Sequence, residues 1–312
     1  MLGNERRMKQ QIQRLVPAPL RKQLKRMLAH RVLTSSRSAA SAVGKVDAYW
    51  RDRINDVISS PDNAHIPRHP SAGQLKGYTI TMHKGVQVCA NGYYGAGILN
   101  MLIENRGVHE PQEERAFDLI IRLLPDECSM LELGAYWGFY SLSLLQERPR
   151  ATCFLVEPET FNLVSGRINF RLNGKKGNFT QASVDRKPQD HPRTISVDSF
   201  CREHKIDHLH ILHADIQGYE LAMLEGAKGF LAGGNADFVF ISTHSAKLHV
   251  DCIEELESLG YIILADADME ETFSCDGLIV AKHRSIENPK VIEISKKKAQ
   301  QGGAANADKP HG

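Results

Sequence analysis

The clearest pattern lies in the second half of the chain, where short apolar runs alternate with stretches of helical periodicity. Strands alternating with helices indicate βαβ units, and therefore an α/β fold with a parallel sheet covered on both faces. The last two apolar runs leave no room for a crossover helix between them, so we expect the final strand to run antiparallel to the rest. Seven strands are predicted, at residues 129–135, 152–157, 178–184, 208–215, 237–243, 261–266 and 277–282.

Two shorter patterns precede this region. Residues 78–82 and 86–89 are rich in β-forming side chains and flank a His-Lys-Gly turn, which predicts a hairpin. A helix is expected to begin at Pro111, with Glu113 and Glu114 in the first turn, where acidic residues suit the helix dipole. The apolar face of this helix consists of Phe117, Ile120, Ile121 and Leu124.

The first forty residues differ in charge from the remainder. They hold ten Lys or Arg residues and one acidic residue, which leaves 29 basic and 36 acidic residues in the rest of the chain. Apolar positions recur every three or four residues, so we predict two short amphipathic helices interrupted near Pro17 and Pro19. Such an arm suits contact with an anionic membrane surface or another anionic partner, and a solvated extension is the alternative.

Length and composition exclude several classes of protein. A chain of 312 residues with 42% hydrophobic and 24% charged residues is globular, not disordered or collagen-like. Its six cysteines form no C-x-x-C pair, so we expect buried, reduced thiols. No apolar run is long enough to span a bilayer and no secretory signal is evident. We therefore expect a cytoplasmic protein, which the basic arm would bring to the inner face of the membrane.

These patterns divide the chain into four parts. Residues 1–45 form the basic helical arm, and residues 46–110 hold a proline-rich linker around Pro61, Pro67 and Pro70 together with the hairpin. Residues 111–285 form the α/β domain. Residues 286–312, with a Lys run followed by Gly, Ala, Gln and Asn, are expected to be a disordered tail.

A glycine-containing turn after the first strand of the sheet is the most informative motif. The segment LELGAYWGFYS, from Leu131, places Glu132 two residues before Gly134 and opens a helix after Gly138. Glycine permits left-handed backbone and close approach of a ligand. A dinucleotide fold would require G-x-G-x-x-G, whereas the spacing here is G-x-x-x-G. An acid at Glu132 would repel a pyrophosphate but suits a cationic group such as an ammonium or a sulfonium.

Polar residues also follow the next strands. Glu157 ends the second strand, where an acid can accept the hydroxyls of a ribose; capping of the next helix near Thr160 is the alternative. Ser183 ends the third strand and could flank an adenine ring, although such residues also populate ordinary turns. Asp215 ends the fourth strand beside the proposed cofactor, facing the transferable group.

Histidines supply the candidate proton acceptors. His244, just past the fifth strand, is our choice of base for an acceptor hydroxyl, with His213 or Asp215 orienting it. His213 is equally compatible with a hydrogen-bonded core histidine, and His249 is expected on the following helix. A divalent ion held by Asp215, His244 and Asp276 is an alternative, but no ligand spacing demands a metal.

The motifs ELGAYWGFYS, VEPE and DIQGYELAMLEGA, in this order, resemble the FkbM-type class I methyltransferases, which use S-adenosylmethionine. The resemblance covers residues 110–282, and Glu110-Pro111 before the first helix also fits it. It implies a Rossmann-like sheet of seven strands with an antiparallel last strand, and methyl transfer to oxygen, commonly on sugars, glycans or polyketides. It also assigns the methionine part of the cofactor to Glu132, Gly134 and Gly138, the ribose to Glu157, the adenine region to Ser183 and the substrate side to Asp215.

Three positions depart from the family pattern. Tyr136 replaces the usual Asn of the glycine loop; we keep Tyr136 with the cofactor-binding residues and expect its bulk to shape the acceptor pocket. Gln217 stands where Glu is usual, and His213 where Lys is usual. The set of groups that handle protons is therefore altered.

We predict an S-adenosylmethionine-dependent O-methyltransferase acting on a hydroxyl of a sugar, glycan or related natural product. A non-catalytic S-adenosylmethionine-binding module and an NAD-dependent oxidoreductase are the alternatives. A nucleic-acid acceptor is disfavoured, because the body is acidic and lacks a basic stripe with stacking aromatics. We expect residues 78–107, with Tyr93 and Tyr94, to form a lid over the acceptor.

Overall fold

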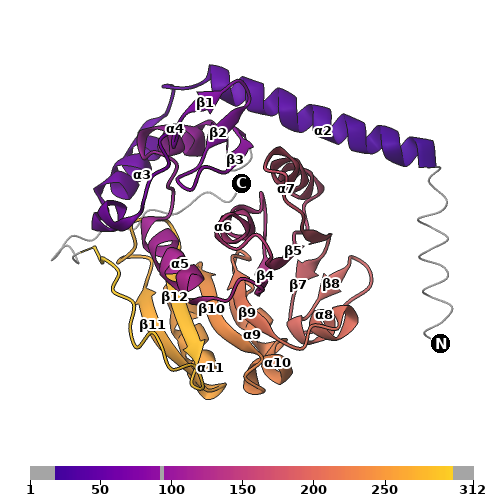
Figure 1. Ribbon diagram of the computed structural model, residues 1–312, viewed down its shortest axis with the longest axis vertical. Coiled ribbons are helices and arrows are strands. Elements are labelled where there is room, and N and C mark those ends of the chain that lie inside the picture. Colours follow the sequence, from indigo (N-terminus) through magenta and orange to yellow (C-terminus); the bar gives the residue numbers. More distant parts are fainter. Residues whose placement is uncertain (1–17, 92–94, 298–312) are drawn as a thin grey trace.

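A central sheet of seven strands organises the fold in the computed structural model, which describes residues 18–91 and 95–297 (Figure 1). The order across the sheet is β11-β12-β10-β9-β4-β5-β6. β12 pairs antiparallel with β10 and β11, and the other pairs are parallel, which confirms the expected α/β fold with an antiparallel last strand. The bounds are β4 Ser129–Leu133, β5 Thr152–Val156, β6 Asn178–Thr180, β9 Leu209–Ala214, β10 Ala236–Thr243, β11 Tyr261–Ala267 and β12 Gly277–His283.

Helices cover both faces of this sheet, because successive side chains of each strand point to opposite sides. Met130 packs into one core and its neighbour Leu131 into the other. The first core lies under α5 Pro111–Leu123, α6 Phe139–Glu147 and α7 Thr160–Leu172. The second lies under α8 Val197–His204, α9 Glu220–Glu225, α10 Lys228–Ala232 and α11 Ala246–Ser258. The helix predicted from Pro111 is α5, and its expected apolar face is buried.

The third predicted strand is wrong in one respect. Residues 178–184 do not form a single strand of the main sheet: β6 ends at Thr180, and the chain then leaves the sheet. Ser183 and Val184 form β7 Ser183–Val184, which pairs with β8 Thr194–Ile195 in a separate two-stranded sheet. The run is continuous in β propensity, but propensity carries no information about a change of pairing partner.

The segment before α5 is more ordered than its proline content indicated. The predicted hairpin is present as β2 Thr79–Thr81 and β3 Gln87–Cys89, extended by β1 Leu75–Lys76. The sequence indicated a linker where α3 Ala48–Ser59 and the 3-10 helix η1 Pro61–His65 lie, and α4 Ala96–Glu104 follows the hairpin. Met82, Val88 and Leu99 are fully buried in the first core, so any lid motion of this region would have to break core packing. Tyr93 and Tyr94 lie outside the described residues.

The described part of the basic arm is one long helix, α2 Ala18–Ser41, with Pro19 in its first turn. The interruption expected near Pro17 and Pro19 coincides with the start of α2, and residues 1–17 lie outside the described part. In Figure 1 the helix runs along the outer side of the molecule and packs against α7. None of the described helices is long and apolar enough to cross a bilayer. Contact of the arm with an anionic membrane stays a prediction.

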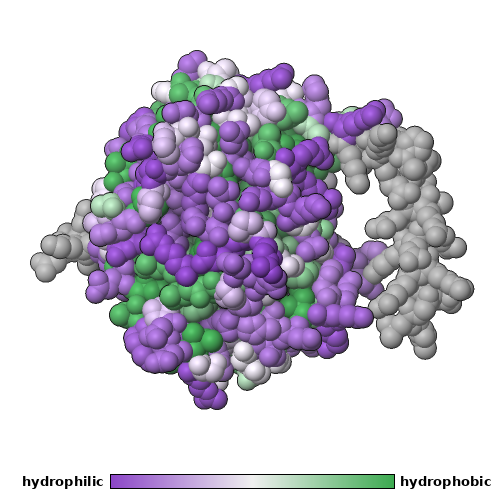
Figure 2. All heavy atoms as spheres, in the orientation of Figure 1, coloured by the Kyte–Doolittle hydropathy of each residue, from purple (hydrophilic) through white to green (hydrophobic). Residues whose placement is uncertain are grey.

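Two further expectations need correction. Residues 286–297, assigned to a disordered tail, pack against the domain: Ile292 is buried and its N–H donates to Leu264 O. Residues 298–312 lie outside the described part. Cys275 is exposed, whereas the other five cysteines are buried as expected. The face of the molecule in Figure 2 is largely hydrophilic, with apolar side chains in small separate patches.

Candidate active site

The loop after β4 has an unusual backbone. Gly134, Tyr136 and Gly138 all have positive φ, of 70°, 45° and 74°. A Cβ on Gly134 would lie 1.7 Å from the carbonyl oxygen of Asp215, so only glycine lets the end of β4 approach the end of β9 this closely. Tyr136 adopts a left-handed conformation that costs energy for a residue with a side chain, a feature that clusters at functional sites.

Side chains from neighbouring elements hold this loop in place. The N–H of Tyr136 donates to Glu157 Oε2 at 3.0 Å. The Asn169 side-chain amide donates to the Trp137 carbonyl at 3.0 Å and accepts the Cys89 N–H at 2.8 Å. Asn169, on α7, therefore links the glycine loop to the hairpin that precedes the domain.

Glu157 sits at the carboxyl end of β5 with only 4% of its surface exposed. Oε1 accepts the Glu159 N–H at 2.8 Å and the Asn162 amide at 3.2 Å. The capping interaction that the sequence left as an alternative is therefore present, because Glu159 is the N-cap of α7. Burial raises the pKa of Glu157, while hydrogen bonds from Glu159, Tyr136 and Asn162 oppose this. A carboxylate offers about four acceptor sites, so Oε2 has capacity for a ligand hydroxyl.

Glu132 binds the first turn of the helix that follows the glycine loop. Its side chain is buried beneath α6, where Oε2 accepts the Ser141 N–H at 3.1 Å and also the Ser141 hydroxyl. Ser141 lies in the first turn of α6, so the carboxylate satisfies a free backbone N–H at that helix end. Burial raises the pKa of Glu132. A contact of Glu132 with the cofactor stays a prediction.

The structure brings Asp215, His244 and Asp276 together at the end of β9 and β10. His244 Nε2 lies 3.4 Å from Asp215 Oδ1 and 3.5 Å from Asp276 Oδ1. On the other side of the ring, Nδ1 lies 2.8 Å from Glu220 Oε1. Burial alone would lower the pKa of His244, but its hydrogen bonds with Asp215 and Glu220 and the charge of Asp276 raise it to about 10.

A pKa of about 10 makes the imidazole of His244 a cation at neutral pH in the ligand-free protein, whereas the sequence analysis proposed a neutral base and left a metal ligand as an alternative. Gln217 Nε2 lies 2.8 Å from His244 Nε2, and its amide can donate to the neutral ring or, when turned, accept from the charged ring. The divalent ion considered from the sequence has no support beyond the proximity of the three side chains.

His213 does not orient His244 as the sequence suggested. It is buried against α5, with Nε2 2.7 Å from Glu113 Oε1 and its ring centroid 4.2 Å from that of Tyr140. Burial lowers the pKa of His213, but the Glu113 carboxylate outweighs this and the net shift is upward. Ser242 donates to the other oxygen of Glu113 at 3.2 Å.

A small polar recess adjoins these groups. Asp276 belongs both to its wall and to the His244 cluster. The lining holds three carboxylates, two hydroxyls and one amide, and no Lys or Arg is among the described residues that form it. The lining residues are Glu110, Gln112, Glu113, Ser242, Ser274, Asp276, Gly277 and Leu278.

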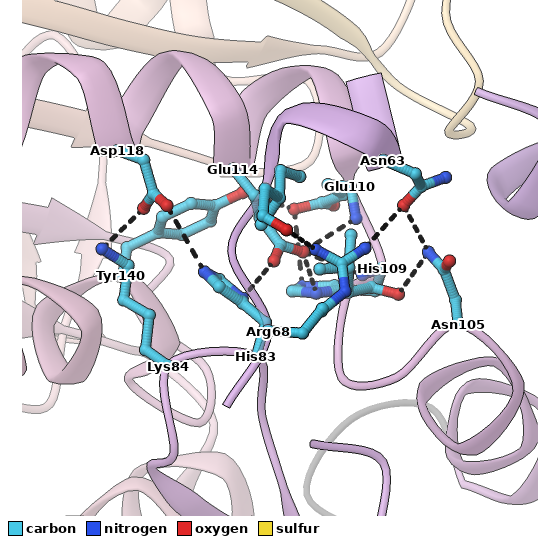
Figure 3. A network of polar contacts seen from close by, with 12 residues as sticks. Asn63, Arg68, His83, Lys84, Asn105, His109, Glu110, Glu114, Asp118 and Tyr140 are labelled. Atoms are coloured by element: carbon cyan, nitrogen blue, oxygen red, sulfur yellow. Dashed lines mark hydrogen bonds and ion pairs between the residues drawn. The ribbon is translucent and has the colours of Figure 1, made fainter. Parts of the chain in front are cut away.

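The first turn of α5 also anchors a buried ionic network (Figure 3). Glu114 lies between two histidines, with Oε2 2.8 Å from His83 Nδ1 and Oε1 2.7 Å from His109 Nδ1. The Tyr140 hydroxyl donates to Glu110 Oε2 at 2.7 Å, which connects this network to the wall of the recess. His83 comes from the hairpin turn, so the network joins the hairpin to the domain.

Two remaining candidates lie apart from the cluster. Ser183 is in β7, outside the main sheet, and whether it contacts an adenine stays a prediction. His249 lies on α11 as expected, with Nδ1 2.9 Å from Thr243 Oγ1. The sequence reading gave no role to Glu220, although it belongs to the DIQGYE motif, and it treated Glu113 only as a helix-dipole residue.

Part of the chain is similar to a known protein family. Residues 145–263 match the family model of the methyltransferase FkbM domain. None of the curated proteins matches the chain in sequence.

Three solved structures are similar to the chain in outline, all with TM-scores below 0.5. Methyltransferase FkbM from Methylobacillus flagellatus KT is 15% identical, with a TM-score of 0.44 over 81% of this chain and 59% of that one. Precorrin-6y C5,15-methyltransferase from Geobacter metallireducens GS-15 is 14% identical, with a TM-score of 0.39 over 55% of this chain and 87% of that one. TrmK from M. capricolum, in complex with S-adenosyl-homocysteine, is 12% identical, with a TM-score of 0.39 over 54% of this chain and 68% of that one. Over residues 145–263, the chain is therefore similar to the methyltransferase FkbM domain.

Proposed function

We propose that the protein transfers the methyl group of S-adenosylmethionine to a hydroxyl of a sugar, glycan or related polyhydroxylated natural product. The observation that carries this proposal is the recess beside Asp215 and His244. Its carboxylates can accept a hydrogen bond from a ligand hydroxyl, and its serine hydroxyls can donate one to it. Three carboxylates line the recess, and their charge disfavours an acceptor that carries a phosphate or a carboxylate.

The cofactor would lie along the carboxyl ends of β4 and β5. Glu157 accepts the ribose hydroxyls, while Gly134, Tyr136 and Gly138 provide the loop against the methionine part, with Glu132 behind it. Ser183 is assigned to the adenine region and Asp215 to the side that faces the acceptor. When bound, the cofactor supplies an activated methyl group on a sulfonium, so positioning by the protein can account for much of the rate.

His244 is assigned to the acceptor proton. Glu220 holds the ring through Nδ1, so Nε2 faces Asp215 and Asp276 at the recess. A cationic donor beside Asp215 would lower the pKa of His244 from its unliganded value of about 10, because like charges disfavour the imidazolium. The neutral ring could then remove the proton of the acceptor hydroxyl.

Cofactor binding tests the first part of this proposal. Titration with S-adenosylhomocysteine is expected to show binding that a Glu157→Ala variant loses by at least tenfold, and NAD is expected not to bind. Glu159→Ala is the matched control, because the exposed Glu159 side chain makes no capping hydrogen bond. Failure of the folded protein to bind S-adenosylhomocysteine would contradict the proposal. Binding of NAD instead would favour an oxidoreductase.

Methyl transfer tests the second part. With labelled S-adenosylmethionine, we expect transfer to neutral glycosides in preference to uronates or sugar phosphates. His244→Asn should reduce kcat by a factor of about 10²–10⁴, the usual contribution of a general base, and should leave the affinity for S-adenosylhomocysteine unchanged. An unchanged kcat would remove His244 from proton transfer, and binding of cofactor without transfer to any hydroxyl would favour the non-catalytic module.

A further inference from the structure

We propose that His208, His210 and Asp237 form a binding site for a transition-metal ion of the zinc type, at the amino end of the sheet. His208 immediately precedes β9, His210 lies within it, and Asp237 is on the neighbouring strand β10. β9 spans six residues, so this site lies about 20 Å from Asp215 at the opposite edge. It is independent of the proposed methyl transfer.

Strand geometry brings the three side chains to one place. His208 and His210 are two residues apart in an extended segment and therefore point to the same face, with ring centroids 4.9 Å apart. The parallel register pairs Ala236 with Leu209 and Phe238 with Ile211, which sets Asp237 beside the histidines. His208 Nε2 already lies 2.9 Å from Asp237 Oδ1.

The ligand atoms are close enough to share one ion. One potential ligand atom from each side chain lies within 4.8 Å of the other two. Tetrahedral zinc with bonds of about 2.1 Å holds its ligands about 3.4 Å apart, so small side-chain rotations suffice. Two imidazoles and one carboxylate suit zinc, cobalt or nickel, whereas magnesium and calcium prefer oxygen ligands alone.

The surroundings leave the histidines available to a metal. The Ser129 N–H donates to His210 Nδ1 at 3.1 Å, and an ion bound at this nitrogen would compete with the hydrogen bond. His208 is exposed, which leaves the remaining coordination positions to water. We therefore expect moderate affinity, in the micromolar range.

Direct metal binding tests the site. Tag-free, chelator-treated protein is titrated with Zn²⁺ by calorimetry, and Co²⁺ absorption reports a site with nitrogen ligands. We expect His208→Ala and Asp237→Asn each to weaken binding at this site at least tenfold. The control variant His65→Ala, which removes another exposed histidine, should bind as the unaltered protein does. Mg²⁺ should not compete.

Two readouts separate loss of the site from loss of the fold. S-adenosylhomocysteine affinity should be equal in all variants, and Zn²⁺ should raise the melting temperature of the unaltered and His65→Ala proteins only. If His208→Ala folds poorly, His208→Gln replaces it, because glutamine keeps the polar surface without the imidazole. The proposal is overturned if the unaltered protein binds no Zn²⁺, or if binding persists undiminished when His208 and His210 are both replaced.

Discussion

Gly134 shows how one residue can couple two strand ends. Its φ of 70° is unfavourable for any residue with a side chain, and the carbonyl of Asp215 occupies the place of a Cβ. The glycine loop and Asp215 are therefore parts of one packed unit, although 81 positions in the sequence separate the two residues. A change at Gly134 should affect Asp215 as well as the loop.

We predict that Gly134→Ala lowers the free energy of unfolding by about 3 kcal/mol, from left-handed strain together with overpacking. Gly174→Ala is the matched control, since Gly174 has a φ of 63° but nothing within 4 Å of its added Cβ. This control should lose only about 1 kcal/mol. Urea unfolding of both variants makes the comparison, and equal losses would show that the contact with Asp215 is unimportant.

At this scale the sequence identified residue types better than their partners. It placed Glu132, Glu157 and Asp215 at strand ends, where the structure has them. It could not reveal that Glu113 binds His213, because the two are 100 residues apart and meet only through packing of α5 on the sheet. The high pKa of His244 likewise depends on Glu220 and Asp276, which arrive from different elements.

Among the elements, α5 combines two tasks in its first turn. Glu110 and Glu113 line the recess, while Glu114 binds His83 and His109 in the buried network. Apolar periodicity, Pro111 and the acidic first turn were sufficient to predict the helix. They could not distinguish acids that serve the helix dipole from acids that pair with buried histidines, because both patterns look the same in sequence.

The α5 network predicts a pH dependence of stability. Burial alone would lower the pKa of His109, but Glu110 and Glu114 outweigh it and raise the pKa to about 9. A raised histidine pKa stabilises the fold fully below the unfolded value of about 6.5, and this stabilisation is lost as pH rises through the folded value. Burial also raises the pKa of Glu110 to about 8, which acts with the same sign.

Stability should therefore fall by about 1–3 kcal/mol between about pH 6.5 and pH 9. Urea unfolding across this range measures the slope. His109→Gln should be less stable at low pH and show a flatter profile, whereas His65→Gln, on an exposed histidine, should keep the original slope. A steep profile that survives in His109→Gln would assign the dependence to other groups.

For the molecule as a whole, the segment before α5 and the segment after β12 meet beside α5. Ser295 N–H donates to Asp62 Oδ2 at 2.9 Å, and the Gln112 amide donates to the Ser295 carbonyl at 2.5 Å. Asp62 is fully buried and also pairs with Arg115 of α5. The extension before the domain and the segment after it therefore form one layer against the helix that lines the recess. Composition alone predicted a linker before the domain and a tail after it, because the few buried apolar side chains in these segments do not alter their polar composition.

The last prediction concerns this layer. Ending the chain after Lys290 removes the buried Ile292 and the Ser295 contacts, and loss of a buried isoleucine costs about 2–5 kcal/mol. We expect the melting temperature to fall by about 5–15 °C, given about 2–4 °C per kcal/mol for a domain of this size. Ending the chain after Lys297 is the control, because it keeps every one of these contacts. Thermal unfolding of both truncations decides the matter: if they melt alike, residues 291–297 do not hold the layer in place, and the contacts with Asp62 and Gln112 contribute little to the fold.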